Sequence, residues 1–397
     1  MKKFLLILSG IFLGGLVFLA LKGSDFYNKI YTPKKNHVVK EKTAYNILLF
    51  GYGGGKHEGT YLTDTVILAH VDIKSKRVTL FSIPRDLWVK LPTKSGADFH
   101  SKINAVYQTE LFPNDYPDLD PKYMGTKEDA TLVKHVMFQI FGQEVDYYAA
   151  IDFEGFKKAI DIIGGIDVNV EQSFEDPEYP IDGKEKDLCD KDTEELFKKA
   201  EVFMKPGYNP EDRDRVFKEE PKVEEFVKNA TESPELAFPC RYEKLEFKKG
   251  ITHMNSETAL KYARSRHSPT DGGDFNRAKR QQQIIEAVKN KILSIGFITR
   301  AIPLLDEFKN NLRTDVGIDE VKKFIGFVSS ASEYTITSFV FTDDDLLKNA
   351  VSNDGQYILI PTSGMDQWKE IQMGVKNIMQ GIFPTQSPTA TPSGTLK

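Results

Sequence analysis

Four arginines lie close together in residues 257–292, ETALKYARSRHSPTDGGDFNRAKRQQQIIEAVKNKI: they are Arg264, Arg266, Arg277 and Arg280. The stretch is typical of a helix, a glycine-rich loop and a second helix. A guanidinium group binds phosphate oxygens through two parallel N–H donors, whereas lysine offers a single charge. The spacing therefore predicts a phosphate or pyrophosphate site. Structural salt bridges to Asp271 and Asp274 are an alternative that this stretch leaves open.

The second helix is predicted to begin at Asp274, which can act as its N-cap after two glycines. Apolar residues then recur at helical spacing and predict a face toward a core: Ile284, Ile285, Val288 and Ile292. At about 100° per residue, Arg277, Arg280 and Gln281 project on that side, and Lys279, Gln282 and Glu286 project away. Cations in the first turns oppose the helix dipole, but a bound anion would reverse the sign of this effect.

A second set of polar residues lies near predicted strand ends. Residues 46–50 predict a strand that runs into a glycine-rich loop at 51–59. The loop matches neither GxGxxG nor GxxxxGK[ST], so a phosphate cradle and a flexible loop both remain open. Arg85 and Asp86 follow a predicted strand at 78–83. That position suits a site at a sheet rim, and it equally suits a mutually paired surface turn.

The other elements must position these groups. Apolar runs at 66–71 and 78–83 predict a hairpin of buried strands. Helices are predicted at 102–107, 126–141 and 153–163, and further strands at 147–151 and 166–170. In the helix at 126–141 one face is apolar, and Gly142 ends it. Strands that alternate with helices predict an α/β fold, a layered αβα domain around a central mixed sheet.

The chain has 397 residues, of which 40% are hydrophobic, and a net charge of −5. Its bulk charge does not suggest a nucleic-acid-binding protein. Lys2 and Lys3 precede an apolar run at 4–21 that no A-x-A site follows, which favours an uncleaved membrane anchor in residues 1–22 over a cleaved signal peptide. The positive-inside rule predicts a cytoplasmic N-terminus and an extracytoplasmic body after a linker at 23–44.

The rest of the chain divides by composition. Within a main domain at 45–292, residues 171–247 are predicted to be an exposed, charged insertion with one helix at 194–204. Cys189 and Cys240 lie in this insertion, and in an oxidising compartment we expect them to form a disulfide. Residues 293–383 predict an α/β extension or a completion of the main sheet. Residues 384–397, rich in Pro, Thr and Ser, predict a disordered tail.

Six motifs in a fixed order resemble the LytR-CpsA-Psr family of bacterial envelope proteins. They are NILLFG, LTDT, SIPRD, KINAVY, YYAAIDFEGFKKAIDIIGGIDVNV and ETALKYARSRH…DFNRAKRQQQ, and they cover residues 45–292 apart from the insertion. The resemblance implies a membrane-anchored phosphotransferase with its body outside the cytoplasm. Such an enzyme moves a glycan phosphate from a polyprenyl-pyrophosphate carrier to peptidoglycan, with Mg²⁺ as cofactor.

The resemblance also implies roles for single residues. The implied catalytic residues are Asp64, Arg85 and Arg277. The implied pyrophosphate-binding residues are Arg85, Arg264, Arg266, Arg277, Arg280 and Gln281. Asp64, in LTDT, corresponds to a metal-binding aspartate, and the chemistry agrees because phosphoryl transfer depends mainly on positioning and charge stabilisation. A general base for the acceptor hydroxyl is expected among Asp64, Asp86 and Asp274.

Two positions depart from the family pattern. Gly53 stands where a metal-binding aspartate is common, and Leu62 stands where an arginine is common. Glu58 is a candidate replacement ligand for Mg²⁺, and as a hard oxygen donor it suits this ion better than His57. These departures keep two other functions open, a pyrophosphate-lipid hydrolase and a non-catalytic protein that binds polyprenyl pyrophosphate or wall polymer.

Overall fold

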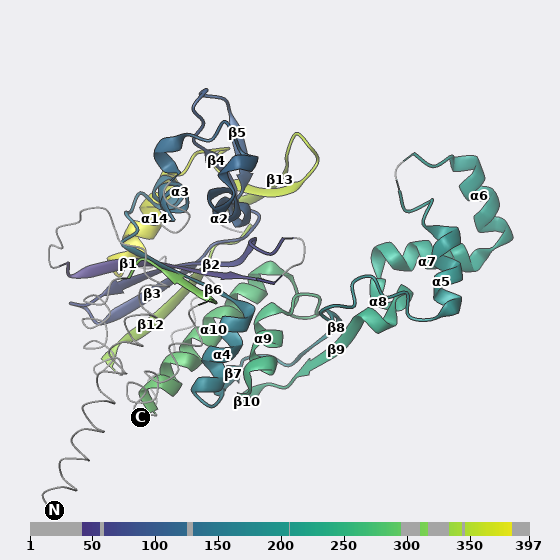
Figure 1. Cartoon of the computed structure of the whole chain (residues 1–397). Helices are drawn as coiled ribbons and strands as arrows, with labels where there is room; N and C mark the ends of the chain where they lie inside the picture. Colours follow the sequence, from purple (N-terminus) through teal and green to yellow (C-terminus); the bar gives the residue numbers. More distant parts are fainter. Residues whose placement is uncertain are drawn as a thin grey trace, which may run out of the picture. The chain divides into compact units, whose positions relative to one another are not determined.

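The computed structural model describes residues 42–55, 59–124, 130–205, 207–294, 310–316, 333–343 and 346–382 (Figure 1). The described residues form two compact units. Unit 1 comprises those within Met1–Asp167, His253–Leu260 and Ala278–Lys397, and unit 2 comprises those within Val168–Thr252 and Lys261–Arg277. Four elements contain the points at which the chain passes from one unit to the other: β7 (Ile166–Val170), β10 (Gly250–Met254), α9 (Ser256–Arg264) and α10 (Gly273–Ser294).

Within the described residues, unit 1 is built on a six-stranded sheet with the strand order β11-β6-β1-β2-β3-β12. The strands are β1 (Ala44–Tyr52), β2 (Thr63–Asp72), β3 (Arg77–Ser82), β6 (Tyr147–Asp152), β11 (Leu312–Thr314) and β12 (Thr335–Val340). β1 pairs with β6 in parallel, and β3 pairs with β12 in parallel, whereas the other neighbours are antiparallel. The predicted mixed sheet and its central hairpin are confirmed.

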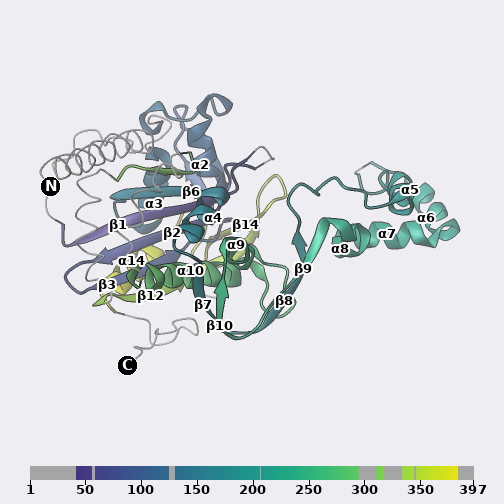
Figure 2. The ribbon, with the colours of Figure 1, turned by 60° about the horizontal axis from the view of Figure 1, so that its bottom comes forward.

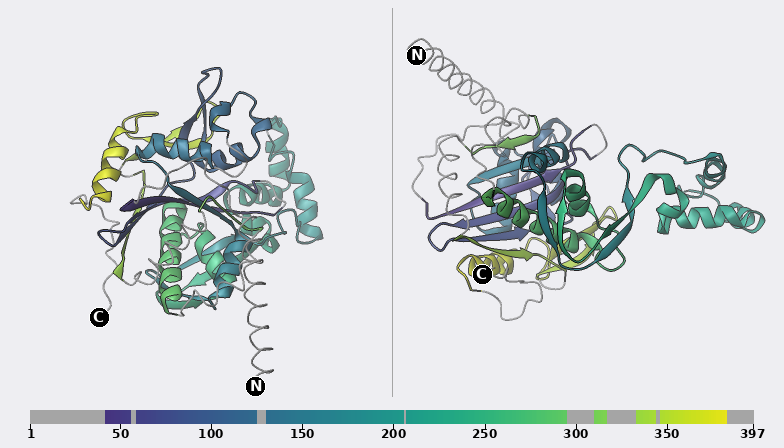
Figure 3. Two further views of the ribbon diagram at one scale, coloured as in Figure 1. Left: turned by 60° about the vertical axis from the view of Figure 1, so that its left-hand side comes forward. Right: turned by 90° about the horizontal axis from the view of Figure 1, so that it is seen from below.

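Helices cover both faces of this sheet (Figure 3). The main helices of unit 1 are α2 (Ile103–Leu111), α3 (Thr131–Phe141), α4 (Phe153–Ile162), α14 (Lys369–Met379) and the part of α10 from Ala278 onward. Side chains alternate between the faces along each strand. Phe50 therefore stacks on Tyr107 of α2 at 5.3 Å between ring centroids, while Ile67 and Leu80 pack on the opposite face with Ile285 of α10. The predicted αβα layering is confirmed for unit 1.

Helix α3 shows how the apolar pattern selects the buried face. All five residues predicted to line one side are buried: Val133, Val136, Met137, Ile140 and Phe141. Gly142 ends the helix in the left-handed conformation, with φ of 64°. The described helix begins at Thr131, later than predicted, and its first backbone N–H groups donate to the buried carboxylate of Glu110 on α2. Burial raises the pKa of Glu110 to about 7.

The C-terminal part of the chain completes the central sheet. β11 pairs with β6 at one edge, and β12 pairs with β3 at the other. The predicted boundary between a domain at 45–292 and an extension at 293–383 is therefore not a boundary between compact units, because both edge strands come from the later segment. The described strands of the later segment thus contribute to the main sheet, which is one of the two roles that the sequence left open. β13 (Leu347–Val351) and β14 (Tyr357–Pro361) form a separate antiparallel pair.

Unit 2 contains the insertion. β8 (Phe174–Pro180) and β9 (Tyr242–Phe247) form an antiparallel ribbon, and the helices between them are α5 (Lys191–Ala200), α6 (Pro210–Glu219), α7 (Pro221–Glu232) and α8 (Pro234–Ala237) (Figure 2). These helices share a small core around Ala200, Val223 and Phe226. The sequence indicated only one of them, although proline at the first turn of α6, α7 and α8 is a helix-start signal.

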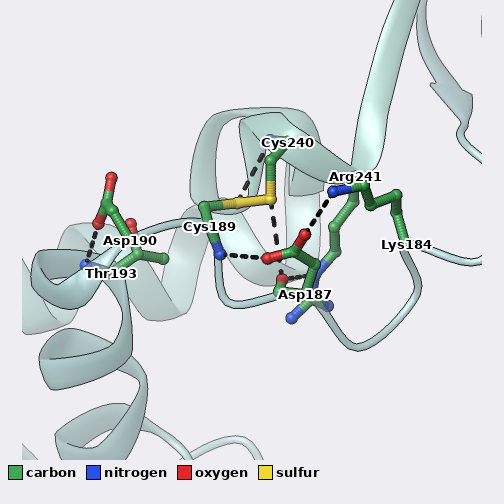
Figure 4. The surroundings of a disulfide bond; sticks show 7 residues. All are labelled: Lys184, Asp187, Cys189, Asp190, Thr193, Cys240 and Arg241. Carbon is green, nitrogen blue, oxygen red and sulfur yellow. Dashed lines mark hydrogen bonds and ion pairs between the residues drawn. A yellow bond between two sulfur atoms is a disulfide. The ribbon is translucent and has the colours of Figure 1, made fainter.

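A disulfide joins Cys189 to Cys240, the pair expected from the sequence, and closes the segment that carries these helices (Figure 4). Asp187 lies beside it and accepts a hydrogen bond from the backbone N–H of Cys189 at 2.9 Å. The backbone carbonyl of Asp187 accepts from Nε of Arg241 at 2.6 Å. These contacts hold together the two ends of the helical segment that lies between β8 and β9.

Three sequence predictions fall on residues outside the described ranges. They are the anchor at 1–22, most of the linker at 23–44 and the tail at 384–397. In the part of the chain that is described, no helix combines the length and apolar character needed to span a membrane.

Candidate functional site

Three of the sequence motifs meet at one end of the sheet in unit 1. Because β2 and β3 are antiparallel, the start of β2, with LTDT, lies beside the end of β3, with SIPRD. KINAVY at the start of α2 lies against both. The backbone N–H of Asn104 donates to the carbonyl of Arg85 at 3.2 Å, and the hydroxyl of Thr63 donates to the carbonyl of Asn104 at 3.2 Å.

These contacts bring together a compact group of charges. Nη1 of Arg85 donates to Oδ1 of Asp64 at 3.0 Å, and Nε of Arg85 lies 3.6 Å from Oδ2 of Asp86. Lys102 donates from Nζ to Oδ1 of Asp86 at 2.6 Å. The side chain of Asp64 is 40% exposed and that of Arg85 25% exposed, so both can reach a ligand. Arg85 and Asp86 are thus close enough to pair, as one of the two sequence interpretations expected, and a site at the rim stays a prediction.

The carboxylate of Asp64 suits a magnesium site that has few protein ligands. Mg²⁺ in phosphoryl-transfer sites is usually held by one or two protein carboxylates, with phosphate oxygens and water as the remaining ligands. Asp64 offers one exposed hard oxygen donor. Among the described residues, no group of three or more His, Cys, Asp or Glu side chains forms a candidate metal site. Glu58, the other predicted ligand, lies outside the described residues.

The glycine-rich loop after β1 folds back on itself where it is described. The backbone N–H of Gly54 donates to the carbonyl of Thr60 at 2.9 Å, and a side chain at Gly54 would collide with Asp152 at 2.8 Å. Gly54 also has φ of 69°, which favours glycine. Nearby, burial and then the charge of Asp152 raise the pKa of Tyr52 to about 12, so this phenol stays protonated. The described part of the loop is therefore tightly packed.

Two predicted arginines are buried on α10. Arg277 is 5% exposed and Arg280 is 2% exposed, and they lie one helical turn apart, as the periodicity predicted. Gln281 is half-buried. The helix begins at Gly273, one residue before the predicted start, so Asp274 lies in its first turn.

The predicted outward direction of Gln282 is wrong. Its side chain is buried and donates from Nε2 to the hydroxyl of Ser82 at 2.8 Å and to the carbonyl of Phe339 at 3.0 Å. The two acceptors lie on neighbouring strands of the sheet, which the periodicity of one helix cannot reveal. The hydrogen bonds offset the cost of burying the amide.

In unit 2, Arg266 and Arg277 flank one carboxylate. Nη1 of Arg277 lies 3.3 Å from Oδ1 of Asp274, and Nη1 of Arg266 lies 4.0 Å from the same oxygen. The salt bridge that the sequence left open is therefore present at Asp274. It does not exclude a phosphate ligand, because each guanidinium has five N–H donors and a carboxylate uses only some of them.

Strand β8 holds the segment that carries Arg264 and Arg266. Oδ2 of buried Asp176 accepts from the hydroxyl of Ser265 at 2.6 Å and from the backbone N–H groups of Arg266 and His267 at 3.0 and 3.2 Å. The sequence interpretation assigned this acidic segment to a solvated face, which is wrong for Asp176. A single carboxylate in a charged stretch carries no local sign of a partner some 90 residues away.

The structure thus places the predicted residues in two groups. Unit 1 holds Asp64 and Arg85 in direct contact, and Arg280 and Gln281 on α10. Unit 2 holds Arg264, Arg266 and Arg277, the last two around Asp274.

Known proteins resemble this chain in sequence. Biofilm regulatory protein A of Streptococcus mutans is 26% identical over 82% of this chain and 66% of its own length. The polyisoprenyl-teichoic acid–peptidoglycan teichoic acid transferases TagU of Oceanobacillus iheyensis and TagV of Bacillus subtilis are each 26% identical. Those alignments cover 73% and 79% of this chain and 64% and 60% of the relatives. The chain thus spans less than two thirds of the length of these relatives.

The fold is shared with solved structures. A protein from Streptococcus agalactiae aligns with a TM-score of 0.53 and 20% identity, over 88% of this chain and 92% of that protein. Bacillus subtilis TagV aligns with a TM-score of 0.51 and 20% identity, over 87% of this chain and all of that chain. The model of the LytR_cpsA_psr family matches residues 15–373. Since this match covers most of the sequence, the chain belongs to the LytR_cpsA_psr family, as its six motifs led us to expect.

Proposed function

We propose that this protein is a membrane-anchored phosphotransferase. It moves a glycopolymer phosphate from a polyprenyl-pyrophosphate carrier to peptidoglycan during assembly of the cell envelope. Relatives named as polyisoprenyl-teichoic acid–peptidoglycan teichoic acid transferases support the reaction class. The anchor is residues 1–22, with the N-terminus in the cytoplasm and the body outside.

The observation that carries this proposal is the burial of Arg277 and Arg280 near the N-terminus of α10. Two cations here oppose the dipole of the helix. Asp274 already offsets part of this conflict through its ion pair with Arg277. A dianionic or trianionic phosphate ligand would stabilise the two arginines further, and N-terminal N–H groups favour the same ligand. Two buried arginines near a helix N-terminus therefore favour the binding of an anion there.

The chemistry requires one bond to form and one to break. The acceptor hydroxyl oxygen attacks the glycan-linked phosphorus, and the bridging P–O bond of the pyrophosphate breaks. The polyprenyl phosphate leaves, and the hydroxyl proton passes to a base. Arg85 and the arginines of the sixth motif would neutralise charge on the phosphate oxygens. Of the candidate bases, Asp86 is the least suited, because Lys102 and Arg85 already engage it.

Magnesium completes the proposal. Asp64 is the residue that we propose to hold it, with phosphate oxygens and water as the other ligands, and bound Mg²⁺ would supply further positive charge to the phosphates. In this arrangement Arg85 is positioned to exchange its contact with Asp64 for a contact with phosphate.

A product assay tests the function. The full chain in detergent is incubated with a glycan-linked polyprenyl pyrophosphate, a peptidoglycan oligosaccharide and Mg²⁺, and the products are identified by mass spectrometry. We expect a phosphodiester-linked conjugate. Free glycan phosphate would instead support the hydrolase that the altered metal loop keeps open. Donor that is bound and never consumed, with a competent acceptor present, would support a binding protein.

A further inference from the structure

The β8–β9 ribbon of unit 2 (Figure 2) contacts the segment that carries Arg264 and Arg266 at three levels, which are an apolar cluster, the backbone and the arginine side chains. The first level is apolar. Tyr262 at the end of α9 is buried, and its ring lies 5.9 Å from Phe174 on β8 and 5.0 Å from Phe247 on β9. This packing fixes the end of the helix from which the arginine segment starts.

The second level is the backbone of the segment. Asp176 is 1% exposed, and its Oδ2 accepts the hydroxyl of Ser265 and the backbone N–H groups of Arg266 and His267. Its Oδ1 accepts the backbone N–H of Glu178 at 3.1 Å. A buried carboxylate with four donors is strongly oriented. Three consecutive residues that bind one oxygen are held in a single backbone conformation.

The third level is the arginine side chains. His267 donates from Nδ1 to Oε2 of Glu178 at 2.7 Å, and its Nε2 accepts from Nε of Arg266 at 3.0 Å. The second bond requires an unprotonated Nε2, so the first fixes the tautomer. The bond to His267 uses Nε of Arg266 and not its two terminal nitrogens, of which Nη1 lies 4.0 Å from Oδ1 of Asp274. Arg264 is held by Asp182 at 3.4 Å and by the ring of Tyr179 at 5.5 Å.

We propose that Asp176, together with the Glu178–His267 pair, is a positioning device that fixes the orientation of Arg264 and Arg266, each of which would bind one phosphate of a lipid pyrophosphate. These residues do not touch the ligand themselves and act through the two arginines. A bidentate grip on phosphate depends on orientation, so a guanidinium that is free to rotate binds less well. This inference rests on the proposed function, because it takes the lipid pyrophosphate as the ligand.

The test compares binding of two lipids by the full chain in detergent. Farnesyl pyrophosphate carries two phosphates and farnesyl monophosphate carries one, and equilibrium dialysis gives Kd for each. The variant Asp176→Asn keeps the size of the side chain but cannot offer one oxygen to three donors. We expect its Kd for the pyrophosphate to rise about tenfold, with less than a threefold change for the monophosphate.

A matched control lies on the same strand. Glu175 is next to Asp176, is exposed and pairs with Lys244 at 2.7 Å on the surface. Glu175→Gln should leave both Kd values unchanged. Glu178→Ala removes only the partner of His267 and should raise Kd for the pyrophosphate about threefold. If Asp176→Asn does not fold, Glu178→Ala tests the positioning role in its place.

The outcomes separate this inference from the proposed function. Equal weakening of both lipids by Asp176→Asn, together with a lower melting temperature, would assign Asp176 a purely structural role and overturn the positioning role. Unchanged pyrophosphate binding in a folded Asp176→Asn or Glu178→Ala variant would do the same. If the wild-type chain binds neither lipid, the proposed function itself fails, and this inference fails with it.

Discussion

Nη1 of Arg85 lies 3.0 Å from Oδ1 of Asp64, so the residue proposed to bind phosphate is in contact with the residue proposed to bind the metal. The two motifs that carry them, SIPRD and LTDT, are separated by a β-hairpin and meet because its strands are antiparallel. In the proposed reaction, Asp64 would hold Mg²⁺ and Arg85 would bind phosphate oxygens in place of this internal ion pair.

The first prediction concerns Asp64. Asp64→Ala should abolish Mg²⁺-dependent transfer in the product assay while the binding of farnesyl pyrophosphate persists, because the arginines remain. Equilibrium dialysis and mass spectrometry of the products give the two measurements. Asp118→Ala is the control, because the side chain of this aspartate lies in a loop after α2 and accepts a hydrogen bond from Ser95. Full transfer activity in Asp64→Ala would rule out Asp64 as the metal ligand.

The second prediction concerns Arg277. Arg277→Ala should weaken the binding of farnesyl pyrophosphate about 10- to 100-fold, since a hydrogen bond between charged groups contributes roughly 1.5–3 kcal/mol. The fold should stay intact, although the loss of a buried arginine and its salt bridge to Asp274 should lower the melting temperature. Arg215→Ala is a matched control, because Arg215 is an exposed arginine on α6 that pairs with Asp212. Unchanged binding in Arg277→Ala would leave Arg277 with only its salt bridge to Asp274.

The third prediction concerns the disulfide between Cys189 and Cys240. Intact-mass measurement of protein exported to an oxidising compartment should show that reductant adds the mass of two hydrogen atoms. A crosslink that closes a loop of 51 residues stabilises by about 4 kcal/mol in the chain-entropy model. Cys189→Ser with Cys240→Ser should therefore make residues 189–240 sensitive to protease while the sheet of unit 1 stays protected. Two free thiols in the exported protein would refute the pairing.

The fourth prediction concerns Glu110, whose pKa burial raises from 4.5 to about 7. Between these values the folded state keeps a proton that the unfolded state releases. Stability is therefore fully present below about pH 4.5 and falls as the pH rises toward 7, by up to about 1.4 kcal/mol per pH unit.

Thermal melts between pH 5 and 8 measure this effect. Glu110→Gln removes the ionisation and should flatten the pH dependence of the melting temperature, at the cost of one hydrogen bond to the start of α3. Glu370→Gln, at an exposed position on α14, should leave the slope as it is in the wild type. A wild-type melting temperature that does not fall over this range would contradict the shifted pKa of Glu110.

Much of unit 1 was predictable because its signals are local. Alternating or continuous apolar runs identify β1, β2, β3 and β6, and the apolar face of α3 follows from its helical period. The burial of Arg277 and Arg280 follows from the same period in α10. Six short motifs were enough to identify the family, because their residue types and order are specific even where the intervening sequence is not.

Other features were decided only by the tertiary structure, because they depend on residues far apart in the chain. β11 and β12 are short strands whose place at the sheet edges is set by pairing with β6 and β3. Gln282 is buried because Ser82 and Phe339 lie within reach, and Asp176 is buried because the arginine segment surrounds it. A sequence read locally determines which residues can form an element or carry a charge. The partners that satisfy a buried polar group are fixed only when the whole chain has folded.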